Sequence, residues 1–146
     1  MVKKFFRRKE FLFVTITLIV VLLDQLTKFL IYKFKPNWDL LILKIQFIQN
    51  TGAGFGILKG QTFWLGIISL IVALGIIFSY NRIPKEKWIQ VLFATFLGGV
   101  IGNLIDRFFR KFVIDFINFG FWPAFNIADA CISVSVVGLV IYFWKK

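Results

Sequence analysis

The sequence contains no histidine and a single cysteine, and these two scarcities narrow the chemistry open to it. Without histidine, the chain cannot form a Ser/His/Asp or Cys/His nucleophile system, an H-E-x-x-H metal site or a histidine proton switch. The single Cys131 excludes an internal disulfide and a C-x-x-C metal or redox pair. We therefore expect no metal and no cofactor, and we interpret Cys131 as a small apolar side chain.

Charged residues are scarce as well. They make up 17% of the 146 residues, against roughly 25% in soluble domains, whereas 59% of the residues are apolar and 19% are aromatic. A globule of this size would leave much of that apolar surface in water. The composition therefore predicts a membrane protein.

Acidic residues are the rarer charged class: 18 Lys and Arg stand against 7 Asp and Glu, for a net charge of +11. Such an excess suits nucleic-acid binding in a soluble protein, but here the basic residues cluster where lipid headgroups would lie. No RNA-binding motif or basic-aromatic strand platform is visible. We expect contacts with membrane lipids and none with nucleic acid.

Four apolar runs have about the 20 residues needed to cross a 30 Å hydrocarbon core: 11–32, 62–80, 88–105 and 124–144. The first follows a basic cluster, as a secretory signal does, but no small-x-small cleavage site follows it, so it is expected to remain as an anchor. No internal repeat or linker divides the chain. The predicted fold is an all-α membrane domain, residues 1–146, built as a four-transmembrane-helix bundle.

The charge distribution predicts the orientation of these spans. Four spans place both termini on one side, and ten basic residues lie on that side, which the positive-inside rule makes cytoplasmic. Tryptophan favours the headgroup region, and all five tryptophans fall beside proposed span ends: Trp38, Trp64, Trp88, Trp122 and Trp144.

Both outer loops carry structural signals. Residues 43–47 alternate apolar and polar side chains, which predicts a short outer β-element, a small cradle on the outer face. The following Gly52, Gly54 and Gly56 indicate either a plain turn or a ligand-facing loop. The second outer loop, residues 108–122, mixes charges with seven aromatic residues and is expected to lie in the interface plane as a loop or helix.

Four of the seven acidic residues lie in or at the rim of the membrane: Asp24, Asp106, Asp115 and Asp129. Counted from the inner ends of their spans, Asp24, Asp106 and Asp129 rise about 20, 27 and 22 Å, which brings all three near the outer leaflet. A carboxylate there costs on the order of 2 to 3 kcal/mol, and less near the interface. A cluster of carboxylates from three helices therefore indicates function.

Asn103 with Asp106, and Asn126 with Asp129, repeat an N-x-x-D frame that puts amide and carboxyl on one helix face. Asn126 alone reads as an N-cap with Asp129 as a first-turn acid, but two frames facing each other across an antiparallel helix pair favour function.

Three further features are open to structural explanations. Asp24 and Lys28, four residues apart, predict a neutralising pair. The G-x-x-x-G pattern from Gly98 to Gly102 predicts close helix packing, within the chain or between chains. Arg107 either holds a carboxylate or reaches lipid phosphates.

Two close carboxyls suit one kind of chemistry. They share one proton, because the second negative charge is repelled. The ionised acid can take a proton from water as that water attacks an amide, while the protonated acid polarises the carbonyl and later protonates the leaving amine. The arrangement predicts aspartic proteolysis at the outer membrane surface.

Five blocks resemble, in order, the signature of the lipoprotein signal peptidases (signal peptidase II): Asp24-Gln25 with Lys28; Asn50-x-Gly52 with Phe55; Gly99-x-x-Gly102-Asn103-x-x-Asp106-Arg107; Val113-Ile114-Asp115-Phe116; and Phe125-Asn126-x-Ala128-Asp129. The resemblance covers nearly the whole chain. Gly54 departs from it, since Ala is commoner there.

The resemblance implies that Asp106 and Asp129 form the catalytic dyad. The implied substrate is a prolipoprotein, cut just before a Cys that carries diacylglycerol, at the outer leaflet of the bacterial cytoplasmic membrane. No oligomer is required. The resemblance also implies a set of pocket residues: Asp24, Lys28, Asn50, Gly52, Asn103, Arg107, Asp115 and Asn126.

Two other functions remain as alternatives. In a small proton- or cation-coupled transporter, Asp24, Lys28 and Asp129 would form a relay, although the acids gather at one face instead of marking a path across the bilayer. A Ser/Lys peptidase would use Ser133 or Ser135, which lie deeper in the fourth span than Asp129.

Overall fold

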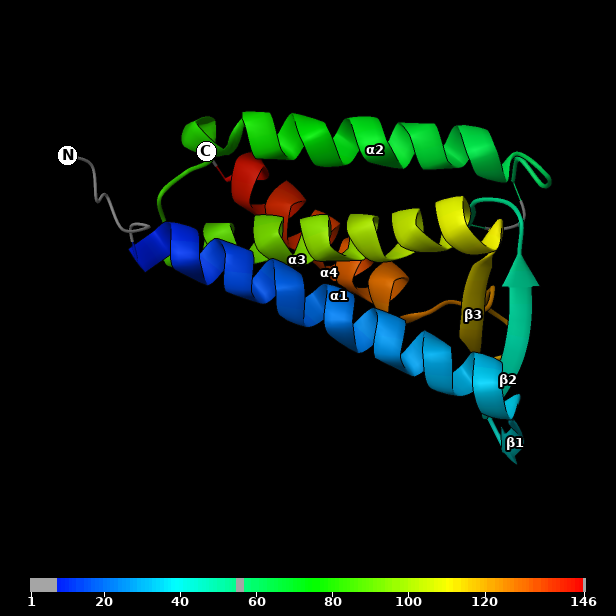
Figure 1. Ribbon diagram of the computed structural model, residues 1–146. Coiled ribbons are helices and arrows are strands. Elements are labelled where there is room, and N and C mark those ends of the chain that lie inside the picture. The colour runs from blue at the N-terminus through cyan, green and yellow to red at the C-terminus, as the bar shows by residue number, and fades with distance from the viewer. Residues whose placement is uncertain (1–7, 55–56, 146) are drawn as a thin grey trace.

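The computed structural model of the chain describes residues 8–54 and 57–145. Within these ranges, helices run side by side and a small sheet lies across one end of them (Figure 1). The first residues of the N-terminal basic cluster lie outside the described residues, as do Phe55 and Gly56.

The four apolar runs all fold as helices: α1 (Arg8–Phe34), α2 (Thr62–Phe78), α3 (Lys87–Ile105) and α4 (Ile127–Trp144). Three helical segments are long and apolar enough to cross a membrane: Lys9–Phe34, Lys87–Arg110 and Ile127–Trp144. Helix α2, with 17 residues, is a shorter apolar helix. The described part of the chain thus contains three span candidates, and a spanning role for α2 stays a prediction.

Helix α3 is the centre of the helical layer and packs against α1, α2 and α4. A Cβ added at Gly98 would meet Val20 of α1 at 2.6 Å, and one added at Gly99 would meet the Ala128 carbonyl oxygen of α4 at 2.6 Å. The predicted close packing at the G-x-x-x-G segment is therefore confirmed, and it occurs within the chain.

The sheet is antiparallel, with the order β1 (Asn37–Leu40), β2 (Leu43–Asn50), β3 (Val113–Asn118). The strand predicted at residues 43–47 is confirmed as part of β2. Pairing of β2 with β3 joins the two outer loops, which are far apart in the sequence. The start of α1 and the end of α4 lie at the opposite end of the molecule (Figure 1).

The prediction of an interfacial loop or helix over residues 108–122 is wrong for the middle of this segment, which is a strand. Residues 113–116 are buried in β3, where Ile114 and Phe116 pack with Ile31 of α1. Branched side chains favour a strand, and the ladder with β2 satisfies its backbone groups. The flanking aromatics Phe109, Phe121 and Trp122 are exposed.

A π-helical segment, η3 (Asp106–Arg110), continues α3 and ends at Lys111, whose φ of 67° lies in the left-handed region. Such segments widen a helix locally and often occur at functional sites. Here η3 turns the chain from α3 into β3, so that one continuous stretch supplies Asp106 at the end of the helix and Asp115 in the sheet.

Candidate active site

The four predicted acids gather where the helices meet the sheet. Asp24 comes from α1, Asp106 from the start of η3, Asp115 from β3 and Asp129 from the first turn of α4. The first three are buried, with exposed fractions of 0%, 0% and 2%, whereas Asp129 is partly exposed. The acids are divided between two hydrogen-bonded groups.

The first group, here called the Lys28 cluster, consists of Asp24, Gln25, Lys28, Asp106 and Arg110. Lys28 Nζ lies 2.8 Å from Asp24 Oδ2 and 3.1 Å from Asp106 Oδ2, so the pairing predicted for Asp24 and Lys28 is confirmed. Gln25 Nε2 donates to Asp106 Oδ1 at 3.2 Å, and Arg110 pairs with the same oxygen.

The carboxylate of Asp106 is fully engaged in this cluster. Its Oδ1 accepts from Gln25 and Arg110, and its Oδ2 accepts from Lys28 and from the backbone N–H of Ile114 at 3.1 Å. Two cations therefore flank a carboxylate that has no exposed surface. The sequence interpretation overlooked Arg110, although its position four residues after Asp106 is a signal for this pair.

The second group connects Asp115 and Asp129 through two asparagines. Asn126 is the N-cap of α4: its Oδ1 accepts from the Asp129 N–H at 2.9 Å, and its own N–H donates to Asp129 Oδ2 at 3.2 Å. The Asn126 Nδ2 also donates to Asp115 Oδ1 at 2.8 Å. The capping explanation for Asn126 is thus confirmed, and the same residue contacts both carboxyl groups, Asp115 through its side chain and Asp129 through its backbone N–H.

Asn103 connects the two groups. Its Nδ2 donates to Asp129 Oδ1 at 2.7 Å, while its Oδ1 accepts from Lys28 Nζ at 2.9 Å. The two N-x-x-D frames therefore interact across the helix pair, because Asn103 bonds the acid of the other frame instead of its own Asp106.

Asn50 holds Asp115 from the first outer loop. Its Nδ2 donates to Asp115 Oδ2 at 2.9 Å, and its Oδ1 accepts from the Gly52 N–H at 2.9 Å. A Cβ at Gly52 would meet the Ile57 carbonyl oxygen at 2.7 Å, so only glycine fits this turn. Gly54 has open space around it and no positive φ, so the departure there does not affect the turn.

The Asp115 carboxyl is held in an unusual electrostatic environment. Burial removes the solvation of its charged form, and the negative charge of Asp129 adds to this effect, which together raise the pKa of Asp115 to about 7. The hydrogen bonds from Asn50 and Asn126 act in the opposite direction. Asp115 is thus poised to exchange a proton near neutral pH.

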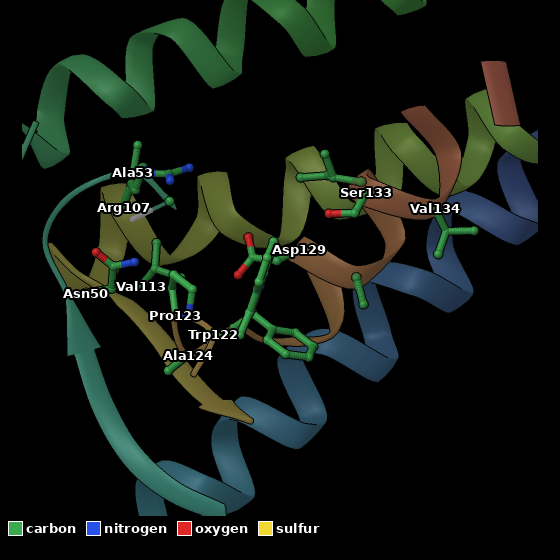
Figure 2. A pocket seen from close by; sticks show the side chains of 14 residues that line it. Asn50, Ala53, Arg107, Val113, Trp122, Pro123, Ala124, Asp129, Ser133 and Val134 are labelled. Carbon is green, nitrogen blue, oxygen red and sulfur yellow. The ribbon is translucent and has the colours of Figure 1, made fainter. Parts of the chain in front are cut away.

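A cavity of about 390 Å³ opens onto this second group (Figure 2). Asp129 of α4, Arg107 of η3 and Asn50 of β2 line it, together with Trp122 and Pro123 of the second outer loop. Asp115 lines a neighbouring cavity of about 240 Å³, which shares Asn50, Pro123 and Ala124 with the first. Asp106 is among the lining residues of neither cavity.

Arg107 presents a guanidinium to the larger cavity. Its Nη1 donates to Ser69 Oγ of α2 at 3.1 Å, and its buried Nε has no hydrogen-bond partner among the described residues. Among the described residues Arg107 forms no ion pair with a carboxylate, so both explanations for this side chain stay predictions. The sequence interpretation overlooked Ser69, which has no motif around it.

The expected dyad of Asp106 and Asp129 does not match this geometry. Asn103 and Lys28 lie between the two acids, in the order Asp129, Asn103, Lys28, Asp106. Asp115 is instead the acid that shares a hydrogen-bonding partner, Asn126, with Asp129. Sequence spacing placed the acids at similar depths, but not their lateral positions.

The Ser/Lys alternative gains no support from the geometry. Ser135 is fully buried, and its Oγ has no hydrogen-bond partner among the described residues. Lys28 is engaged by Asp24, Asp106 and Asn103, so it is not available to either serine. In the described part of the chain, no group of His, Cys, Asp and Glu side chains is arranged to hold a metal ion.

Apolar helices that enclose buried carboxylates beneath a small sheet define a membrane-embedded enzyme. Two solved structures described as bacterial membrane enzymes share this fold. One has a TM-score of 0.85 at 30% identity, covering 99% of this chain and 93% of the other. The second has a TM-score of 0.82 at 29% identity, covering 100% and 99%.

Residues 16–145 match the family model of signal peptidase (SPase) II, so the chain belongs to this family of proteases. A lipoprotein signal peptidase of Halothermothrix orenii is 33% identical over 136 residues, which cover 90% of this chain and 94% of the relative. The lipoprotein signal peptidase of Bacillus pumilus is 40% identical over 136 residues, covering 86% and 88%.

Proposed function

We propose that this protein is an aspartic endopeptidase that removes signal peptides from prolipoproteins, cutting before a diacylglyceryl-modified Cys, with Asp115 and Asp129 as its acid and base. Family membership and the names of the relatives support the substrate class. The observation that carries the catalytic assignment is that Asn126 donates to both carboxyl groups beside the cavity, to Asp115 from its side chain and to Asp129 from its backbone N–H.

The preference for Asp115 over Asp106 rests on what each carboxyl can still do. An acid catalyst needs an oxygen that can hold a proton and reach the substrate. Four donors, two of them cationic, occupy the oxygens of Asp106. Asp115 has a pKa near neutrality and lies next to Asp129. Asp106 then acts as a positioning residue, because it holds Lys28 against Asn103.

In this mechanism, the partly exposed Asp129 takes a proton from a water molecule in the cavity as the water oxygen attacks the scissile carbonyl carbon. Asp115, protonated, donates a hydrogen bond to the carbonyl oxygen. It then gives its proton to the leaving amine as the C–N bond breaks. Proton transfer from Asp129 to Asp115 restores the starting state. Arg107 and Asn50 bind peptide carbonyl oxygens along the cavity.

The proposed setting is the bacterial cytoplasmic membrane, crossed by all four helices, with both termini cytoplasmic and the site near the outer leaflet. Helix α2 rises about 26 Å at 1.5 Å per residue, which is at the short end of spanning lengths. The start of α1 and the end of α4 at one end of the molecule support this topology (Figure 1). One chain supplies every residue of the site, so no oligomer is needed.

The transporter alternative has no support from family membership or from geometry. Lys28 is fully buried between Asp24 and Asp106, and the acids remain at one end of the helices. A relay across the bilayer would need polar side chains along its inner half as well.

Purified protein in liposomes should cleave a diacylglyceryl-modified precursor and leave the unmodified precursor intact. Mass spectrometry of the products would locate the cut before the modified Cys. The same liposomes should show no proton flux without substrate. Proton flux without cleavage would overturn the proposal in favour of the transporter.

The rate of cleavage should depend on pH through Asp115. Because Asp115 must carry a proton to act as the acid, kcat should fall as the pH rises above about 7, the pKa of this carboxyl. Replacing Asn50 by Ala removes a donor that favours the carboxylate, so the pKa of Asp115 should rise and the alkaline limb of the profile should move to higher pH. An alkaline limb that stays in place, or moves to lower pH, would contradict this role.

A further inference from the structure

A second hollow lies between α2, α3 and α4. It has a volume of about 600 Å³ and is lined only by apolar side chains. Its walls are α2 and α4, and its floor is α3. We call it the α2–α4 groove and define it by its lining residues: Val72, Ile76, Phe93, Phe96, Val136, Leu139, Val140, Phe143 and Trp144.

The α4 residues that line the groove follow, along the helix, those that line the active-site cavity. Ser133 and Val134 line the active-site cavity and follow Asp129 along the helix (Figure 2). Val136 and Val140 come next, and they line the groove. At 100° per residue, positions 129, 133, 136, 140 and 143 share one helix face. A ligand in the groove therefore points one of its ends at Asp129.

We propose that the α2–α4 groove binds the apolar segment of the signal peptide in helical form, so that the scissile bond is delivered to Asp129. This inference rests on the proposed function and adds a substrate-binding surface to it. From Asp129 to Phe143 is 14 residues, about 21 Å of helix. An apolar signal segment of 7–15 residues spans about 10 to 22 Å as a helix, which fits this length.

A different hollow, also mainly apolar, lies between α1, α2 and α3 and is lined by Phe13, Leu18 and Ile101 among others. Its lining includes no residue of α4, the helix that carries Asp129, so a segment bound there does not run along the helix that leads to the active-site cavity. A wall formed by α4, the helix that also lines the active-site cavity, is thus what distinguishes the α2–α4 groove from this other hollow.

Tryptophan substitutions on neighbouring residues test the groove. Val140 lines it and is 58% exposed, whereas Ile141, 100° further around α4, does not line it and is 50% exposed. Val72 and Ile71 form the same kind of pair on α2, with 36% and 63% exposed. Because these side chains are exposed, the larger ring fits without disturbing a core.

With a diacylglyceryl-modified precursor in mixed micelles, Val140→Trp and Val72→Trp should each raise KM about tenfold with kcat unchanged. Ile141→Trp and Ile71→Trp should leave both constants at the wild-type values. Equal KM values in all four variants would overturn the groove while wild-type cleavage kept the proposed function intact. An increase only for Leu18→Trp would assign the segment to the other hollow and overturn the groove as well.

Cross-linking tests occupancy without cleavage. In a Cys131→Ser, Asp129→Asn background, Val140→Cys should be trapped by a bifunctional thiol reagent to a cysteine in the middle of the precursor's apolar segment. Ile141→Cys should not be trapped. Equal trapping at both positions, or trapping at neither, would overturn the groove, whether or not the wild-type protein cleaves the precursor.

Discussion

Asp129→Asn and Asp115→Asn are each expected to lower kcat for a diacylglyceryl-modified precursor by about 10²- to 10⁴-fold, the range that a general acid or base contributes. An amide at position 129 cannot take a proton from water. An amide at position 115 cannot give one to the leaving amine. Since the two acids act in the same series of proton transfers, the double variant should have a kcat little lower than that of either single variant.

Single-turnover cleavage would measure this loss, and thermal unfolding in detergent would show that the variants fold. Each new amide keeps one acceptor oxygen for Asn126 but turns its NH2 group toward a second donor, Asn103 or Asn50, so a modest loss of stability is expected. Asp39→Asn, at an exposed acid of β1, is the matched control and should cleave like the wild-type protein. A folded Asp115→Asn variant with near wild-type kcat would return Asp106 to the dyad.

Lys28→Met is expected to lower the free energy of unfolding by about 3–5 kcal/mol, because removing one partner of a buried ion pair leaves uncompensated charge. Here two carboxylates lose their partner, since Lys28 Nζ contacts both Asp24 and Asp106. The cost of burying these charges is larger than the benefit of the added apolar packing.

The Lys44 ion pair provides a control of nearly identical geometry. Lys44 Nζ lies 2.8 Å from Asp39 Oδ2, the same distance as in the Lys28–Asp24 pair, but the two side chains are 46% and 60% exposed. Water solvates these charges when the pair is broken, so Lys44→Met should leave the unfolding temperature unchanged.

Neutralising the Lys28 cluster separates the effect of unpaired buried charge on stability from the effect of the changed side-chain shape. A triple variant, Asp24→Asn with Lys28→Met and Asp106→Asn, should recover part of the stability lost in Lys28→Met, because fewer unpaired charges remain buried. Denaturant unfolding in detergent would measure the free energy of unfolding of Lys28→Met, Lys44→Met and the triple variant under the same conditions. Equal stability of Lys28→Met and the wild-type protein would contradict the role assigned to the Lys28 cluster.

The sheet shows which parts of the fold a pattern can predict. Strand β2 has one face toward the helices, and the alternation at its start revealed it. Residues 113–116 of β3 are all buried, and a strand buried on both faces has no alternation to detect. The available signal was local: Val113, Ile114 and Ile117 favour a strand by their branched side chains.

The composition and spacing of this sequence determined its class, its helices and the set of acids that form the site. These features depend on local quantities, because apolar periodicity defines a helix and residue counting gives the depth of a side chain along it. Only the tertiary structure decided which acid shares Asn126 with Asp129, the contact on which the proposed acid–base pair rests. That choice depends on lateral position: η3 turns Asp106 toward Lys28, and the pairing of β2 with β3 brings Asp115 to Asn126. Neither contact follows from spacing, since each joins residues whose separation in space is determined by packing between elements.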